Sequence, residues 1–282
     1  MKRSLDKMMS GDSVIETVDS TSAGTKTIKN PPPFKPGTSR DNDKATINFT
    51  LPKTGDGIIE NKFFTMKYHT GPKTVQIEMK IELPMAKLMD KFFAYAYTSK
   101  MNGLDVMSLF DRKSKNTKEI LESTAAIHHL AKYLSKNKLD IRHKKKLMID
   151  VGGGINPRTA SLFFTFDTNP ESKFLSVDPE MAKKYVETPI HPKIECFDKM
   201  IEDVPFEKYD MDMIIIVAVH CHANMDVLWK RCMALNKPII MLTMPCCKGF
   251  VNTPIDIEPV YYISDPAIPS AKDEVFIFTH GL

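Results

Sequence analysis

One stretch of the chain, residues 146–179, constrains the fold more than any other. Its first apolar run, 147–151, carries Asp150 and is followed at once by three glycines. A helix is predicted over 157–166, and a second apolar run then ends at Asp178. Strand, glycine turn, helix and strand form a βαβ unit, because two parallel strands need a crossover of this kind. The stretch therefore predicts an α/β domain with a parallel sheet.

The glycines and the second acid point to a ligand that contains a nucleoside. Gly152, Gly153 and Gly154 let the backbone turn tightly and let a ligand approach it closely. Asp178 suits a ribose, whose hydroxyls can donate to a carboxylate. Residues 155–158 lack the third glycine of the Gly-x-Gly-x-x-Gly pattern that dinucleotides require. An ordinary βα turn in another α/β protein is the alternative interpretation, and an NAD-dependent oxidoreductase is a more distant one.

The stretch Asp150-Val151-Gly152-Gly153-Gly154 resembles motif I of class I S-adenosylmethionine-dependent methyltransferases, and Val177-Asp178 resembles the acid in that family that holds the ribose. Further elements are predicted in the same order as in that family. They are strands at 193–197, 211–219 and 238–244, a helix at 223–235, and a final strand pair at 259–264 and 274–279. The resemblance covers about residues 146–282. It implies a Rossmann-like class I methyltransferase sheet, S-adenosylmethionine as cofactor, and methyl transfer as the activity.

The resemblance also implies roles for individual residues at the strand ends. Gly152 and Gly154 would face the methionine portion of the cofactor. Asp178 would bind the ribose, and Asp198 the adenine amino group. For Asp198, a surface or capping acid is an equally good interpretation. The residues expected to bind the cofactor are Asp150, Gly152, Gly153, Gly154, Asp178, Asp198 and His220.

A second group of chemistry-bearing residues follows the fourth and fifth strands of this domain. His220-Cys221-His222, with Asp226 and then Pro245-Cys246-Cys247, partially resembles a subgroup that includes tRNA ribose methyltransferases and methyltransferase-like proteins. In this chain His222 replaces the subgroup's glycine, and His220 is offset by one position. Either histidine is a candidate general base for a hydroxyl acceptor, because the unperturbed imidazole pKa of about 6.5 suits proton removal at neutral pH.

Two other interpretations of this group remain open. Its histidines and cysteines are all suitable zinc ligands. Against zinc, the spacing is not Cys-x-x-Cys, and neighbouring residues on a strand point to opposite faces. The cysteines could equally be small apolar residues beside the pocket. We therefore expect no metal site.

Outside the cofactor domain, the chain divides into two further parts. Residues 1–45 are polar and rich in proline, and we expect a disordered basic and polar arm that is a candidate contact for a protein partner. Residues 46–139 are predicted to form an α+β extension, and residues 140–282 the cofactor domain. The extension would contain strands at 46–51, 63–68 and 74–81 and helices at 85–97 and 118–135.

The acceptor is less constrained by the sequence than the cofactor. Residues 136–146 are strongly basic, so RNA is the predicted acceptor; a solvated helix end is the alternative interpretation. The Asn/Asp-Pro-Pro-aromatic signature of amino-group methyltransferases is absent after the fourth strand. Two rival functions are a degenerate member that acts as a scaffold or binding protein, and a protein or small-molecule methyltransferase.

Composition adds a few limits. The 282 residues carry a net charge of only +4, which does not by itself indicate a nucleic-acid binder. No apolar run reaches the roughly 20 residues that span a bilayer, and residues 1–30 lack the apolar region of a secretory signal. Five cysteines do not read as a disulfide framework in a chain of this length, so we expect reduced thiols and an intracellular, cytoplasmic location. Oligomeric state is not predicted.

Overall fold

The computed structural model describes residues 27–28, 46–50, 62–70, 73–81, 83–110, 116–167, 169–245, 254, 257–270 and 272–282. The chain forms two compact units, residues 1–87 and 88–282. Apart from 27–28, the predicted disordered arm over 1–45 lies outside the described residues.

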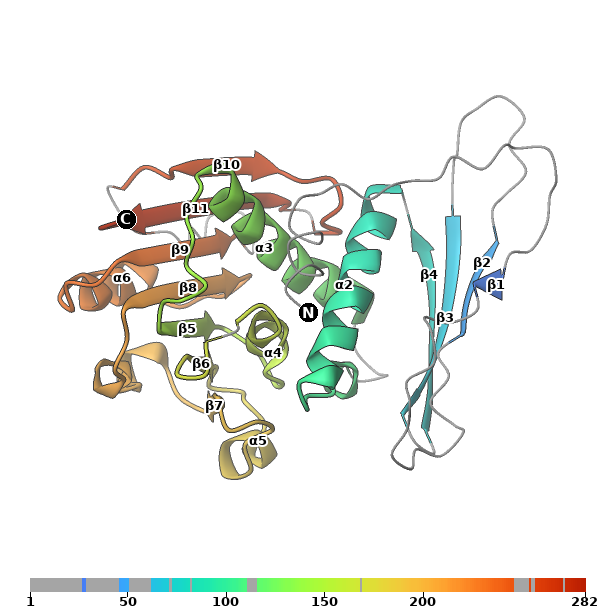
Figure 1. Ribbon diagram of the computed structural model, residues 1–282, viewed down its shortest axis with the longest axis horizontal. Coiled ribbons are helices and arrows are strands. Elements are labelled where there is room, and N and C mark those ends of the chain that lie inside the picture. Colours follow the sequence, from blue (N-terminus) through green and yellow to red (C-terminus); the bar gives the residue numbers. More distant parts are fainter. Residues whose placement is uncertain are drawn as a thin grey trace. The chain divides into compact units, whose positions relative to one another are not determined.

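The first unit contains a four-stranded antiparallel sheet in the order β1-β2-β3-β4 (Figure 1). In β3 and β4 the register runs from Lys62 opposite Ile81 to Thr70 opposite Lys73. Residues of high β-propensity, such as Val, Ile, Phe, Tyr and Thr, are frequent in these strands. The three strands predicted here are confirmed, and β1 was not predicted. The bounds are β1 Thr27–Ile28, β2 Thr46–Thr50, β3 Lys62–Thr70 and β4 Lys73–Ile81.

The second unit is built on a seven-stranded sheet in the order β10-β11-β9-β8-β5-β6-β7. Strands β5 to β9 run parallel, and β11 pairs antiparallel with both β9 and β10. Five parallel strands followed by a strand pair is the order that the resemblance predicted, so the Rossmann-like class I methyltransferase fold is confirmed. The bounds are β5 Lys146–Val151, β6 Lys173–Val177, β7 Ile194–Phe197, β8 Met213–Val219, β9 Ile239–Met244, β10 Tyr261–Ser264 and β11 Glu274–His280.

Helices cover both faces of this sheet. Helices α3 (Asn116–Lys136) and α4 (Arg158–Phe164) pack on one face, where α3 crosses β8, β9 and β11 (Figure 1). Helix α6 (Met225–Met233) packs on the other face with the short helices η2 (Ile201–Asp203) and η3 (Phe206–Lys208). Because side chains alternate along a strand, Ile149 joins the core around Trp229 of α6, whereas Asp150 points towards α4.

Three further helices complete the described part of the chain. Helix α2 (Leu83–Met101) spans the boundary between the units and is longer at both ends than the predicted 85–97. Helix η1 (Val106–Leu109) contacts α4, and α5 (Lys183–Glu187) contacts β7. The sequence did not predict these last two, because four or five residues are too few to show a helical period.

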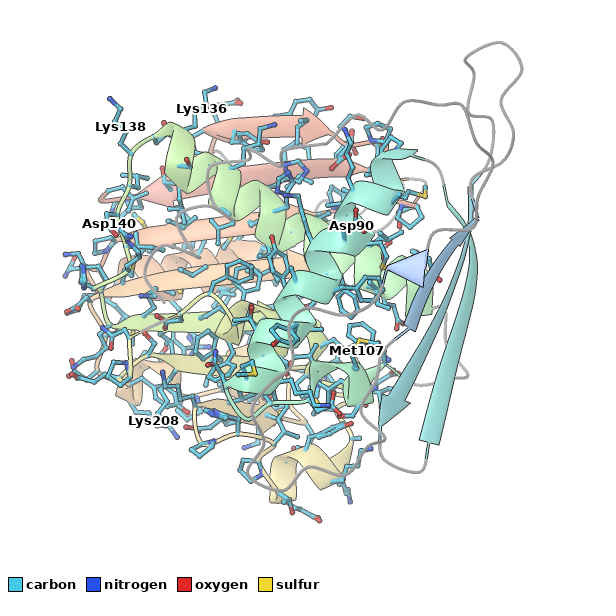
Figure 2. The ribbon with its side chains drawn as sticks, turned by 45° about the vertical axis from the view of Figure 1, so that its right-hand side comes forward. Asp90, Met107, Lys136, Lys138, Asp140 and Lys208 are labelled. Atoms are coloured by element: carbon cyan, nitrogen blue, oxygen red, sulfur yellow. The ribbon has the colours of Figure 1, made fainter. Side chains whose placement is uncertain are left out.

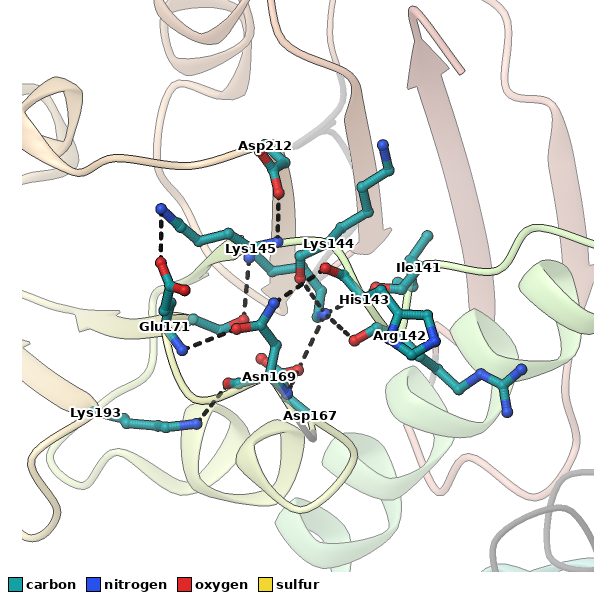
Figure 3. A network of polar contacts seen from close by, with 12 residues as sticks. Ile141, Arg142, His143, Lys144, Lys145, Asp167, Asn169, Glu171, Lys193 and Asp212 are labelled. Atoms are coloured by element: carbon teal, nitrogen blue, oxygen red, sulfur yellow. Dashed lines mark hydrogen bonds and ion pairs between the residues drawn. The ribbon is translucent and has the colours of Figure 1, made fainter. Parts of the chain in front are cut away.

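The basic run at 136–146 leads to the amino end of β5, the edge of the sheet opposite the glycine turn. Lys136 and Lys138 are exposed where α3 ends (Figure 2). The Lys146 side chain is buried, with Nζ 3.0 Å from Asp167 Oδ1 and 2.7 Å from the Lys144 carbonyl oxygen. Figure 3 shows these two partner residues.

Other cations of the run have carboxylate partners as well. Lys145 Nζ lies 2.6 Å from Asp210 Oδ2 and 2.8 Å from Glu171 Oε2. Arg142 pairs with Asp140 in the same loop. Three of the basic side chains in the run are thus engaged with acids of the protein itself.

Within the ranges that the structure describes, no helix combines the length and the apolar character needed to cross a membrane.

Candidate functional site

The carboxyl ends of β5 and β6 are joined by the glycine turn. The Gly152 amide donates to the Val177 carbonyl at 2.9 Å. Two residues later, the Gly154 amide donates to Asp178 Oδ2 at 2.9 Å, and the Glu180 amide donates to Asp178 Oδ1 at 2.7 Å. These bonds fix the Asp178 carboxylate at the mouth of the turn.

Two of the three glycines are required by backbone conformation, and their surroundings differ. Gly152 has φ +73°, and a Cβ at this position would lie 2.3 Å from Cys221 Cβ and 3.0 Å from Cys221 Cα. Gly154 has φ +71°, but a Cβ there would meet nothing within 4 Å. The loop after β8 therefore touches the turn at Gly152, while the space beside Gly154 is open. A ligand can approach the backbone of the turn on this side.

Asp150 lies beneath this turn. Its side chain is buried, and Oδ2 accepts hydrogen bonds from Ser176 Oγ at 3.0 Å and from the Ala160 amide at 3.2 Å. Burial raises the pKa of the Asp150 carboxyl to about 7, and the nearby Asp178 charge adds to this rise, whereas the two hydrogen bonds oppose it. The sequence analysis grouped Asp150 with the cofactor-binding residues. In the structure its hydrogen bonds stabilise the region beneath the turn and the start of α4.

The two other acids of the expected site lie at neighbouring strand ends. Asp178 is partly buried, and its amide donates to the Phe197 carbonyl of β7. Asp198 follows β7 directly and has an exposed side chain. The structure thus places the glycine turn, Asp178 and Asp198 at the ends of adjacent strands. Each oxygen of the Asp178 carboxylate already accepts one N–H bond and has a further lone pair with which it could accept a ribose hydroxyl.

His220, at the end of β8, is held by contacts to three other segments. Its Nδ1 lies 2.7 Å from the Pro245 carbonyl oxygen, and its Nε2 lies 2.9 Å from Glu122 Oε1 and 3.2 Å from Ser270 Oγ. The Ser270 hydroxyl also donates to Glu122 Oε1. The backbone of His220 has φ +53°, which is uncommon for a residue with a Cβ. We call Glu122, His220 and Ser270 the His220 cluster.

Sequence reasoning found His220 but missed its two partners. Glu122 lies on α3, and Ser270 lies between β10 and β11. The only local signal is that Glu122 falls in a helical segment whose other residues are largely small or apolar. Nothing in the sequence indicates which residue such a buried acid would contact.

The remaining residues of the His and Cys group lie apart from this cluster or outside the described part. His222 has an exposed side chain. Cys221 is buried, and its Sγ lies 3.8 Å from Met225 Sδ. Cys246 and Cys247 are outside the described residues. Within the described ranges, no three His, Cys, Asp or Glu side chains are grouped so that they could hold a metal ion. The expectation of no metal site stays a prediction.

Residues just after the glycine turn bind segments that precede the sheet in the sequence. Asn156 Nδ2 and Arg158 Nε both donate to the Leu109 carbonyl, at 2.9 and 3.1 Å. Arg158 Nη1 also lies 2.6 Å from Glu119 Oε2 on α3. The start of α4 is thereby fixed to η1 and α3, which stabilises the downstream side of the turn.

Comparison with known proteins gives only partial likenesses. No protein-family model matches the sequence, and a search of curated proteins finds no match. Among solved structures, the chain resembles PH0226 protein from Pyrococcus horikoshii OT3, with 16% identity, 48% of this chain and 58% of that chain covered, and a TM-score of 0.31. It also resembles the plantazolicin methyltransferase BpumL in complex with a monoazolic desmethylPZN analog and SAH, with 15% identity, coverage of 58% and 63%, and a TM-score of 0.30. The chain thus spans less than two thirds of the length of these structures. The fold assignment therefore rests on this chain's own strand order, which is that of the class I methyltransferase sheet.

Proposed function

We propose that this protein is an S-adenosylmethionine-dependent methyltransferase that binds its cofactor at the carboxyl ends of β5, β6 and β7. The observation that carries the proposal is the bond between the Gly154 amide and Asp178 Oδ2, next to open space at Gly154. This geometry supports Asp178 as the ribose-binding carboxylate, because it lies beside a turn that a ligand can approach. In open α/β sheets, ligands bind at this edge.

Each residue at the edge has a distinct task in this proposal. Gly152 and Gly154 present backbone to the methionine portion, Asp178 accepts hydrogen bonds from the ribose hydroxyls, and Asp198 accepts from the adenine amino group. Asp150 shapes the turn from below. The cofactor supplies a methyl group on a positively charged sulfur, and the protein's contribution is to hold the acceptor atom in line with it.

RNA as the acceptor stays a prediction. The basic run that favoured RNA lies at the amino end of β5, and several of its cations pair with protein acids. An RNA acceptor would therefore reach the glycine edge through other contacts. The rival function, a scaffold that keeps the fold without catalysis, differs in one measurable respect: it transfers no methyl group.

Calorimetric titration with S-adenosylmethionine and S-adenosylhomocysteine tests the proposal. We expect micromolar binding that Asp178→Ala weakens by about 2 kcal/mol or more, since hydrogen bonds to a charged group are lost. Glu171→Gln is the matched control, because Glu171 is an exposed acid that pairs with Lys145 at the opposite edge. No binding by the folded protein would overturn the proposal.

If binding is confirmed, transfer of labelled methyl groups to RNA, protein and small-molecule fractions distinguishes an enzyme from a scaffold. Incorporation that requires Asp178 supports the enzyme. Binding without incorporation into any fraction supports the scaffold.

A further inference from the structure

We propose that Glu122 and Ser270 complete an acceptor site around His220, in which Glu122 holds the imidazole for proton removal and the Ser270 hydroxyl occupies the place of an acceptor hydroxyl. This inference rests on the proposed methyltransferase function and specifies its substrate class as hydroxyl-bearing acceptors. It assigns roles to two residues that the sequence did not single out.

The first argument is the convergence of three polar side chains from distant parts of the chain. Glu122 comes from α3, His220 from the end of β8, and Ser270 from the segment between β10 and β11. The Glu122 side chain is only 5% exposed and that of His220 13% exposed. Polar groups this buried need partners, and here they satisfy one another.

The second argument is the fixed orientation of the imidazole. Since a carbonyl oxygen can only accept, the contact with the Pro245 carbonyl makes Nδ1 the N–H donor. Nε2 is then the ring atom available for proton transfer, and it faces Glu122 and Ser270. The His220 amide bonds the Met244 carbonyl at 2.9 Å, which holds the residue in its left-handed conformation. Strain of this kind is concentrated at functional sites.

The third argument is the position of the cluster relative to the glycine turn. Cys221, the residue after His220, is the one that a side chain at Gly152 would strike. The cluster therefore begins one residue from the contact between the β8 loop and the turn. In the proposed function, Gly152 faces the part of the cofactor that carries the methyl group.

The fourth argument is the set of contacts that the Ser270 hydroxyl makes. It donates to the Glu122 carboxylate and lies 3.2 Å from His220 Nε2. These are the contacts that an acceptor alcohol needs, because its proton must leave as its oxygen attacks. When Nε2 is unprotonated, the acceptor hydroxyl can turn its proton from Glu122 to Nε2; in the reaction this O–H bond breaks and the proton passes to Nε2. The C–O bond forms as the methyl–sulfur bond breaks, and the electron pair of that bond stays on sulfur.

Glu122 acts in this scheme as a positioning residue. Its carboxylate balances the positive charge that His220 gains with the proton. In the resting arrangement Nε2 and Glu122 Oε1 are 2.9 Å apart, so one proton lies between them, and it passes to solvent before Nε2 takes up the acceptor proton. Lys118 Nζ, 3.6 Å from Glu122 Oε1, is the other cation paired with this carboxylate among the described residues.

The test places a better nucleophile where Ser270 lies. Ser270→Cys is incubated with S-adenosylmethionine, and peptide mass spectrometry measures methylation of the introduced thiol. We expect it to be methylated at least about tenfold faster than the thiol of the control Ser264→Cys, because only position 270 lies beside His220 Nε2. Ser264 is an exposed serine of β10. In this reaction the thiol proton leaves to the cluster, the S–CH₃ bond forms, and S-adenosylhomocysteine is released.

A second change tests the part played by Glu122. In the Ser270→Cys background, Glu122→Gln should slow methylation by about tenfold or more, in the range of general-base effects. In the same background Glu122→Asp, which keeps a carboxylate at this position, should restore part of that rate. A purely structural role for Glu122 would leave the methylation rate of Ser270→Cys unaffected by Glu122→Gln.

Calorimetry with S-adenosylmethionine on each variant separates the two possible failures. Binding with no preferential methylation at position 270 overturns this inference and leaves the proposed function standing. Absence of binding in the unchanged, folded protein overturns both. Thermal unfolding of each variant shows that a lost signal is not a lost fold.

Discussion

At the scale of single residues, the buried carboxyl group of Asp150 determines part of the response of the protein to pH. Because burial raises its pKa from 3.8 to about 7, the folded protein holds a proton that the unfolded chain releases between these values. The stabilisation from this group is complete below about pH 4 and is lost as the pH rises to about 7.

Asp150→Asn should remove this dependence on pH. Between pH 5 and pH 8, the unchanged protein should lose about 2 to 3 kcal/mol of unfolding free energy through Asp150, and the variant should not show this loss. Urea unfolding at the two pH values measures it, with the exposed Asp198→Asn as control. Parallel pH profiles for Asp150→Asn and the unchanged protein would contradict the raised pKa.

The glycine turn offers a paired test at the same scale. Gly152→Ala combines a positive φ with a collision against Cys221, whereas Gly154→Ala has the positive φ alone. We expect Gly154→Ala to cost about 1 to 2 kcal/mol of stability and Gly152→Ala distinctly more, since backbone must move. Thermal unfolding compares the two variants, and equal losses would show that the Cys221 contact does not restrict the turn.

At the scale of elements, the sequence predicted the strands well because their signal is local. The strand predicted at 238–244 is apolar almost throughout, as expected of a strand buried on both faces, and the structure places β9 at Ile239–Met244. The helix predicted at 118–135 is confirmed as α3, Asn116–Lys136.

What the sequence could not predict depends on contacts between distant elements. Glu122 and Ser270 are 148 positions apart, and no periodicity links them. Likewise the basic run reads as a surface patch, yet Lys146 is buried because Asp167 and backbone carbonyls lie around its amino group. A run of basic residues in a sequence suggests an exposed surface. Only the folded structure shows that a lysine such as Lys146 is buried and paired with an acid.

The Lys146–Asp167 pair gives a prediction for β5 as an element. Asp167→Asn should reduce the free energy of unfolding by about 3 to 5 kcal/mol, because it leaves the Lys146 charge buried with only neutral partners. The double change Lys146→Met with Asp167→Leu should recover much of this loss. Urea unfolding measures both, and a single change within about 0.5 kcal/mol of the unchanged protein would show that the pair is solvated.

The affinity for S-adenosylhomocysteine should not decrease with this loss of stability. The pair lies at the amino end of β5, and the glycine turn lies at the carboxyl end. S-adenosylhomocysteine affinity of folded Asp167→Asn should therefore equal that of the unchanged protein in calorimetry.

At the scale of the whole molecule, the described contacts of the site all come from one unit. The glycine turn, Asp178 and the His220 cluster bond to residues between Leu109 and Ser270, within the unit 88–282. The two edges of its sheet also carry different groups. Ion pairs lie at the amino edge, whereas the glycine turn, Asp178, Asp198 and His220 lie at the carboxyl edge.

A chain shortened to residues 83–282, which keeps all of α2, should therefore fold and bind S-adenosylhomocysteine. We expect a dissociation constant within about threefold of that of the full chain, a difference below about 1 kcal/mol. Calorimetry on both chains measures it, and Asp178→Ala in each serves as the control for binding at the same pocket. A shortened chain that folds, as shown by a cooperative thermal transition, but does not bind would contradict this prediction.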